Sequence, residues 1–163
     1  MKSDRRYVKR GDVVAIPLPG IGKVAYARVY DEGAVGVYAE LRDPGEPPPV
    51  GLRRFLFQVG VDAHVLRSAA WPKVGSDPFA QDEDPWPAPR FVQDKLDGTF
   101  QRYHRGVLSP AARSEVVGLE PVAAWDRNHV EDRIVAAYRG QPQPWVGAPW
   151  EVPVLDLSGP PRS

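Results

Sequence analysis

Three histidines, His64, His104 and His129, are the side chains of this sequence best suited to metal binding or to proton transfer near neutral pH. They are far apart in the chain, and none belongs to a His-x-x-x-His pair or to a comparable zinc-ligand spacing. The sequence contains no cysteine, which excludes thiol catalysis, disulfides and thiolate metal sites. The spacing therefore predicts no metal site and no cofactor.

Other patterns that could support catalysis have simpler structural explanations. His129 near Glu131 and Asp132 suggests acid–base chemistry, but all three fall in the first turn of an expected helix, where the helix dipole favours acidic residues. Asp94 and Asp97 could form a glycosidase-type carboxylate pair, yet a glycine-containing turn accounts for both. No Gly-x-Ser-x-Gly nucleophile motif is present. We therefore expect that the protein is not an enzyme.

The most acidic stretch lies between residues 75 and 98, where six acidic and two basic side chains give a net charge of −4. Aromatic residues are interleaved with these carboxylates. Such a loop suits the docking of a basic protein surface, because aromatic side chains anchor and charges steer. In the alternative, the aromatic rings pack inward and the charges only solvate the loop. The predicted partner-binding residues are Asp77, Phe79, Asp82, Glu83, Asp84, Trp86, Asp94 and Asp97.

The charge balance limits the partners and the location of the protein. The 163 residues carry 21 basic and 21 acidic side chains. Because no net charge attracts the chain to nucleic acid or to anionic lipid, we expect neither as a partner. No apolar run approaches the roughly 20 residues that span a bilayer, and no signal-peptide pattern follows the charged N-terminus. Together with the absence of cysteine, this predicts a soluble cytoplasmic protein.

The elements that must position these residues are mostly strands. Nineteen prolines and fifteen glycines divide the chain into short pieces, which predicts a mainly β (α+β) fold, either a twisted antiparallel sheet or a small barrel-like domain. In the second expected strand, Val24, Tyr26 and Arg28 fall on one face, and the alternate residues fall on the other. The expected strands are 13–18, 24–30, 34–41, 55–61, 91–93, 100–104 and 107–108.

One clear helix is expected near 128–139. Asn128 and Glu131 match a capping box at its start, and Gly140 provides the stop. A shorter helix is expected within 62–70, and 75–89 is expected to be a loop. A chain of this length fits one domain, so we expect a basic tail at 1–10, a single β-rich domain at 11–140 and a Pro/Trp-rich arm at 141–163.

An ordered set of fragments is spread over residues 10–138. The fragments are Arg10-Gly11-Asp12-Val13, Ile16-Pro17-Leu18, Tyr26-Ala27-Arg28-Val29, Trp71-Pro72-Lys73-Val74-Gly75, Tyr103, Gly118-Leu119-Glu120, Ala124-Trp125 and His129-Val130-Glu131-Asp132-Arg133. In order and spacing this set resembles the immunity protein 26 family, whose members are predicted antidotes of bacterial polymorphic toxins. The resemblance implies a mainly β domain that binds and neutralises a cognate toxin without a cofactor or a catalytic set. If that toxin is a nuclease, its surface should be basic.

Two alternative functions stay open at this point. The opening Gly11-Asp12-Val13-Val14 also resembles the start of small-barrel ribonuclease toxins, in which case Arg28, Arg53 and Arg54 would be candidates for phosphate contacts in an RNA-binding protein or a ribonuclease. In the other alternative, the protein is a structural subunit of a larger assembly and uses the arm at 141–163 for attachment.

Overall fold

The computed structural model describes residues 7–142, and these form two compact units. One unit contains residues 7–88 and 123–142, and the other contains residues 89–122. Residues 11–140, for which the sequence predicts one domain, are thus divided between the two units. Most of the predicted basic tail, residues 1–6, and most of the predicted arm, residues 143–163, lie outside the described residues.

The first unit is built on a six-stranded sheet with the strand order β10-β4-β3-β2-β1-β5. All neighbours in this order are antiparallel except β10 and β4, which are parallel. Helices α1 (Ala63–Arg67) and α3 (Arg127–Tyr138) belong to the same unit, together with the 3-10 turns η1 (Pro19–Ile21) and η2 (Asp31–Gly33). The strands are β1 (Asp12–Leu18), β2 (Lys23–Val29), β3 (Ala34–Tyr38), β4 (Phe55–Val61), β5 (Lys73–Ser76) and β10 (Ala124–Trp125).

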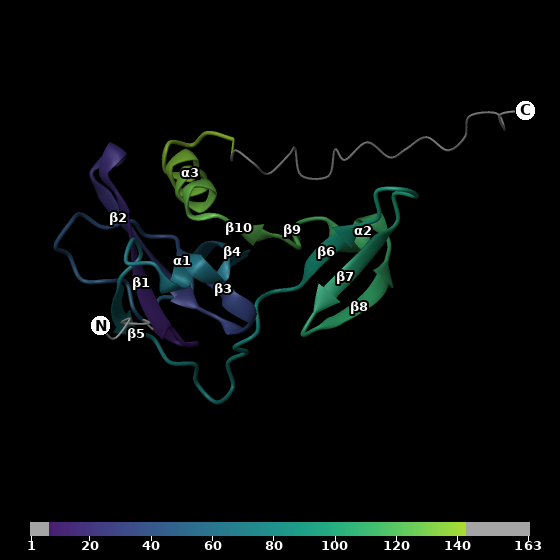
Figure 1. Cartoon of the computed structure of the whole chain (residues 1–163), viewed down its shortest axis with the longest axis horizontal. Coiled ribbons are helices and arrows are strands. Elements are labelled where there is room, and N and C mark those ends of the chain that lie inside the picture. Colours follow the sequence, from purple (N-terminus) through teal and green to yellow (C-terminus); the bar gives the residue numbers. More distant parts are fainter. Residues whose placement is uncertain (1–6, 143–163) are drawn as a thin grey trace, which may run out of the picture. The chain divides into compact units, whose positions relative to one another are not determined.

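The register of this sheet gathers apolar side chains on one face. Ala27 is opposite Val37, and Val37 is opposite Phe57, so the three side chains lie on the same face. Helix α3 covers it, because Ile134 is fully buried and the Arg133 guanidinium carbon lies 4.0 Å from the Phe57 ring centroid. In Figure 1, α3 lies above the strands of this sheet. Burial of this face supplies the main hydrophobic core of the unit.

The opposite face, which we call the mixed face, carries polar groups among its apolar side chains. Arg28 is opposite Val13 on one side and Gly36 on the other, and Tyr26 and Tyr38 share this face. The predicted alternation along β2 is therefore confirmed. The segment after β5, drawn in teal in Figure 1, supplies the groups that contact Arg28.

Helix α3 confirms the predicted C-terminal helix, but its cap differs from the prediction. The N-cap residue is Asp126, whose side chain accepts a hydrogen bond from the Arg127 N–H, so the expected capping by Asn128 is wrong. The cause is that Trp125 ends β10, and the chain turns directly from that strand into the helix. At the other end Gly140, with φ of 66°, provides the predicted stop.

The second unit is a four-stranded sheet with the order β8-β7-β6-β9. Strands β7 and β8 are joined by Arg105 and Gly106, both with positive φ, as a two-residue type I′ hairpin requires. The strands predicted at 100–104 and 107–108 are therefore confirmed. The elements of this unit are β6 (Arg90–Gln93), β7 (Phe100–His104), β8 (Val107–Ala111), α2 (Arg113–Val116) and β9 (Glu120–Pro121).

The mainly β fold class is confirmed, with two corrections to its form. Both sheets are open, so the barrel-like alternative is wrong. Each sheet is also mixed, because β10 joins β4 in parallel and β9 joins β6 in parallel. These two strands contain only two residues each, too few for an alternating pattern to be visible in the sequence.

Gly36 on the mixed face provides a test of this packing. A Cβ atom there would lie 2.8 Å from Tyr30 Cε2, and the Tyr30 ring is itself wedged against Phe55 and Phe79. We predict that Gly36→Ala lowers the free energy of unfolding by about 1–3 kcal/mol through overpacking. The matched control Gly20→Ala, where a Cβ meets nothing within 4 Å, should stay within about 0.5 kcal/mol of the wild type. Urea unfolding of the variants measures both, and equal stability of the two would contradict the described packing.

Candidate functional site

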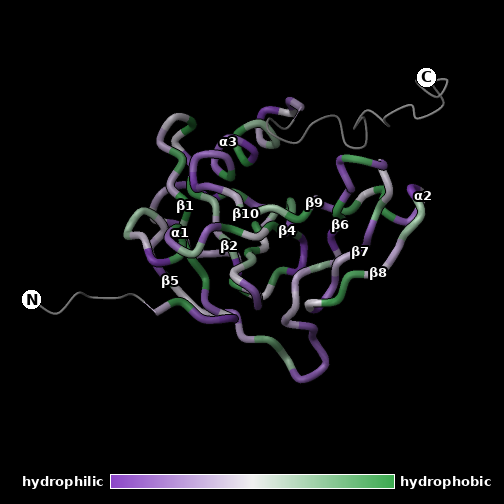
Figure 2. The backbone as a smooth tube through the Cα atoms, turned by 45° about the vertical axis from the view of Figure 1, so that its right-hand side comes forward, coloured by the Kyte–Doolittle hydropathy of each residue, from purple (hydrophilic) through white to green (hydrophobic). Residues whose placement is uncertain are grey.

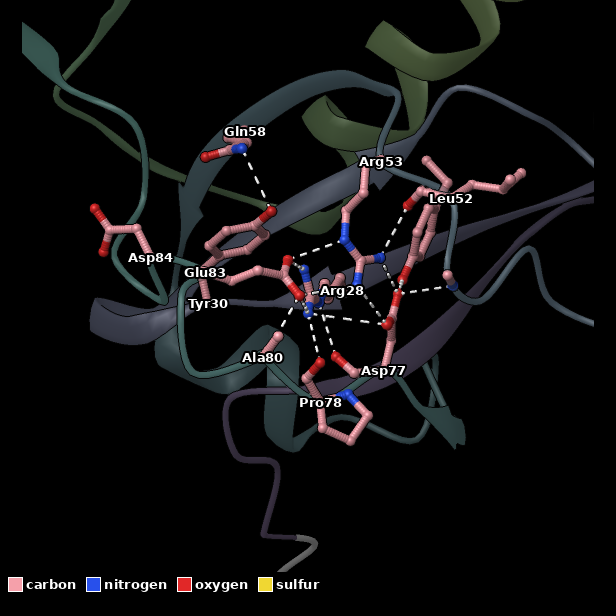
Figure 3. Close-up of polar contacts among 12 residues, drawn as sticks. Arg28, Tyr30, Leu52, Arg53, Gln58, Asp77, Pro78, Ala80, Glu83 and Asp84 are labelled. Carbon is pink, nitrogen blue, oxygen red and sulfur yellow. Dashed lines mark hydrogen bonds and ion pairs between the residues drawn. The ribbon is translucent and has the colours of Figure 1, made fainter.

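The centre of the candidate site is Arg28, a charged residue near the end of β2 whose side chain is only 1% exposed. A buried guanidinium is costly unless its N–H groups find acceptors. Arg28 Nε donates to the Asp77 carbonyl at 2.8 Å, and Nη2 donates to the Pro78 carbonyl at 2.8 Å. Nη1 donates to Glu83 Oε2 at 3.0 Å. The chain after β5 therefore wraps around this one side chain (Figure 3).

Arg53, in the connection before β4, completes the charge balance. Its Nε donates to Glu83 Oε2 at 2.9 Å, and its two Nη atoms donate to the carboxylate of Asp77 at 2.9 and 3.1 Å. Glu83 thus receives hydrogen bonds from both arginines, and Asp77 binds Arg53 in a bidentate manner. We call the set Arg28, Arg53, Asp77 and Glu83 the arginine cluster. Its two positive and two negative charges sum to zero.

Asp77 also connects the cluster to the sheet. The Tyr38 hydroxyl donates to Asp77 Oδ2, and the Gly51 N–H donates to the same oxygen at 3.1 Å. The Asp77 N–H donates to the Gly11 carbonyl at 2.7 Å. With its side chain 5% exposed and bound by three donor residues, Asp77 is a fixed part of the interior.

Residues 77–88, which we call the acidic loop, are held to the first unit along their whole length. Phe79 packs on Arg28, whose guanidinium carbon lies 3.7 Å from the ring centroid. At the far end of the loop, the Asp31 N–H donates to the Pro85 carbonyl at 2.9 Å, and the Ala88 N–H donates to Gln58 Oε1 at 2.9 Å. The loop is therefore fixed at its start, middle and end.

The contacts of the cluster change the pKa values of its members. Hydrogen bonds from Arg28, and then from Arg53, lower the pKa of Glu83 to about 2. Burial raises the pKa of Asp77, but hydrogen bonds from Tyr38, Arg53 and the Gly51 N–H outweigh it, so the pKa lies below its usual value. Burial, and then the hydrogen bond to Asp77, raises the pKa of Tyr38. Both carboxylates are consequently ionised at neutral pH.

The structure separates the predicted partner-binding residues of this loop into two groups. Asp77, Phe79 and Glu83 are brought together around Arg28 and are used internally. Asp82 and Asp84 are exposed. Figure 3 shows the Asp84 carboxylate turned away from the arginine cluster, and Figure 2 shows the tip of the loop as hydrophilic. Trp86 is half-buried, and its backbone N–H donates to Asp84 Oδ1 at 3.0 Å.

Asp94 and Asp97 belong to the second unit, in the turn between β6 and β7. Asp94 Oδ1 accepts hydrogen bonds from the Leu96 and Asp97 N–H groups at 2.7 and 3.2 Å. Asp97 Oδ1 accepts one from the Thr99 N–H at 2.9 Å. Both aspartates are exposed and shape this turn, which presents the 82% exposed side chain of Leu96.

The arginines proposed as phosphate contacts are mostly occupied by protein groups. Arg28 is buried under the acidic loop, so a nucleic acid phosphate cannot reach it, and that predicted role is wrong. Arg53 is 41% exposed, but Asp77 and Glu83 hold its guanidinium. Arg54 is exposed. Of these three arginines, Arg54 alone has the exposed and unoccluded position that contact with a phosphate requires.

Comparisons with protein-family models, with curated proteins and with solved structures found no match to this chain. Among residues 7–142, no helix is both long enough and apolar enough to cross a membrane. The arginine cluster and the loop that it holds are therefore interpreted from their own geometry.

Replacing the central arginine tests how far the cluster supports the fold. We predict that Arg28→Met lowers the free energy of unfolding by about 3–5 kcal/mol, because Glu83 loses one of its donors and two backbone carbonyls lose theirs. Arg54→Met removes a neighbouring exposed arginine and should change the stability by less than about 0.5 kcal/mol. Chemical denaturation followed by tryptophan fluorescence gives both values. A similar loss of stability in the two variants would show that the cluster contributes little to the free energy of unfolding.

The low pKa of Glu83 predicts an acid dependence of stability. The pKa is about 2 in the folded chain and 4.5 in the reference state, so its contribution is complete above about pH 4.5 and is lost as the pH falls toward 2. Glu83→Gln should lower the free energy of unfolding at pH 7 and should make that free energy less dependent on pH over this window. Asp82→Asn, which removes a carboxylate outside the cluster, should reproduce the wild-type curve. Urea midpoints between pH 7 and pH 2 test this; parallel curves for Glu83→Gln and the wild type would contradict it.

Proposed function

We propose that this chain is an immunity protein, an antitoxin that binds a cognate bacterial toxin and neutralises it by protein–protein interaction. The resemblance of its fragments to the immunity protein 26 family suggested this role. The proposed action needs no catalytic residue and no cofactor. The observation that carries the proposal is the acidic loop, which is fixed from within by the arginine cluster while Asp82 and Asp84 remain exposed.

A loop held in one conformation before it meets a partner is well suited to tight binding. Ordering a mobile segment on association reduces affinity, and a preorganised loop avoids that loss. Here Glu83, between the two exposed aspartates, is bound by Arg28 and Arg53 and also accepts the Ala80 N–H at 3.1 Å. The positions of the flanking carboxylates are therefore set by the fold of the free protein.

The charge of the exposed residues specifies the kind of partner. Two aspartates flanking an internally neutralised glutamate add negative potential at the loop tip, although the whole chain is neutral. Such a local patch accelerates association with a positively charged surface. A toxin that acts on nucleic acid carries a basic surface for its substrate. The acidic loop thus favours a basic nuclease as the toxin.

The second unit adds apolar surface of the kind found in protein interfaces. In residues 89–122, five large hydrophobic side chains are substantially exposed, half of those found in the whole described chain. Exposed apolar groups beside polar ones support protein binding more readily than binding of a small charged ligand. The five are Leu96, Val107, Leu108, Val117 and Val122.

Co-expression tests the proposal directly. The product of the neighbouring toxin-like gene should co-purify with this protein, and its toxicity in a bacterial host should be lost when this protein is present. Failure to bind any neighbour-encoded toxin would overturn the proposal. The alternative of an RNA-binding protein or ribonuclease predicts a salt-dependent shift or cleavage of RNA instead. The arm invoked for a structural subunit lies mostly outside the described residues.

Reversing the exposed charges tests the loop as the binding surface. We predict that the double variant Asp82→Lys/Asp84→Lys slows association with a basic toxin by roughly tenfold or more at low salt, and by less at high salt. The control Asp132→Lys reverses a single charge on the exposed surface of α3, and it should leave the association rate close to that of the wild type. Stopped-flow or surface-binding kinetics measure the rates. Unchanged kinetics for the double variant would place the interface elsewhere.

A further inference from the structure

The second candidate site lies in the first unit, where two parallel strands end beside each other. Strands β4 and β10 pair Gly60 with Ala124 and Val61 with Trp125. Each strand is followed at once by an aspartate and then by a helix, α1 after β4 and α3 after β10. The Asp62 N–H donates to the Trp125 carbonyl at 3.0 Å, which holds the two strand ends together. The carboxyl ends of adjacent parallel strands are frequent ligand-binding positions.

Three metal-ligating side chains converge at this point. Asp62, His64 and Asp126 each place one ligand atom within 4.8 Å of the other two. His64 Nε2 lies 3.2 Å from Asp126 Oδ1. Atoms bound to a common ion at about 2.0–2.2 Å are separated by distances of this order. His64 and Asp126 are 62 positions apart in the sequence, so their convergence follows from the strand pairing.

Helix capping does not account for the orientation of both carboxylates. Asp62 is the N-cap residue of α1, yet its side chain makes no capping hydrogen bond. Asp126 is the N-cap residue of α3, and the capping bond of its side chain is to the Arg127 N–H at 3.2 Å. Two carboxylates and an imidazole thus share a small volume in which the carboxylates repel each other. A divalent cation would remove this repulsion.

A cavity adjoins two of the three residues, His64 and Asp126. Its volume is about 340 Å³, and it is lined by His64, Val65, Ser68, Asp126, Arg127 and Asn128. An ion can therefore enter from solvent, since His64 and Asp126 have side chains that are 65% and 54% exposed. The space also accommodates the water molecules that complete the coordination shell of a metal with three protein ligands. Arg127 carries a positive charge close to the cavity. The two aspartates offset this charge and part of the charge of the ion.

We propose that Asp62, His64 and Asp126 form a binding site for a divalent transition-metal ion, with Zn²⁺ as the favoured occupant. The imidazole ligand decides the metal class, because nitrogen ligands suit zinc whereas all-oxygen sites suit Ca²⁺ and Mg²⁺. The filled site joins the start of α1 to the start of α3. It therefore stabilises the folded chain, by an amount that increases with the logarithm of the metal concentration above Kd. This inference is independent of the proposed toxin binding.

The test uses the full-length, tag-free protein after treatment with EDTA. Calorimetric titration with ZnCl₂ should show one saturable site per chain, and Zn²⁺ should raise the melting temperature, whereas Mg²⁺ and Ca²⁺ at the same concentration should not. His64→Ala and Asp126→Asn should each weaken Zn²⁺ binding at least tenfold. Both side chains are exposed, and circular dichroism of each variant checks that it is folded.

Two matched controls identify the ligands. The chain contains only two other histidines, so His104→Ala and His129→Ala should bind Zn²⁺ as the wild type does. Asp62→Asn, which keeps the shape of the side chain, should reduce affinity as the other ligand variants do. No saturable Zn²⁺ binding up to millimolar concentration would overturn the proposal. Equal binding by His64→Ala and the wild type, or preferential binding of Ca²⁺, would overturn it as well.

Discussion

The buried guanidinium of Arg28 is the interaction on which the arrangement of the first unit depends. It lies on the mixed face of the sheet, where an arginine without acceptors would destabilise the fold strongly. Its acceptors are two carbonyls and a carboxylate of the acidic loop. The loop therefore has one conformation in which Arg28 is satisfied, and Phe79 closes over the guanidinium in that conformation.

The position of Arg28 could be predicted from the sequence, but its partners could not. The two-residue period of a strand places Arg28 on the same face as Val24 and Tyr26, as observed. Its acceptors lie 49 and 55 positions further along the chain, and no local pattern connects them to it. For this reason Asp77 and Glu83 resemble surface carboxylates in the sequence, although the fold uses both as internal counter-charges.

The same limit explains the features that local patterns did not reveal. Strand β10 is two residues long, and only its parallel pairing with β4 makes it a strand. Because of that pairing, α3 is capped by Asp126 and not by the predicted Asn128, and Asp126 lies beside His64. Metal-ligand motifs are recognised in a sequence by the spacing of residues within one element. They do not reveal a group of side chains that comes from the ends of two separate strands. The strands of five or more residues and the long helix were predictable because their signals are periodic and local.

The run Asp82-Glu83-Asp84 shows how one loop can serve both stability and recognition. Glu83 is bound by Arg28 and Arg53, so its charge is neutralised and holds the loop in place. The aspartates on either side are exposed. If the charge of Glu83 were not neutralised, repulsion among the three carboxylates would favour a mobile loop. The alternation gives a rigid acidic tip on a chain with no net charge.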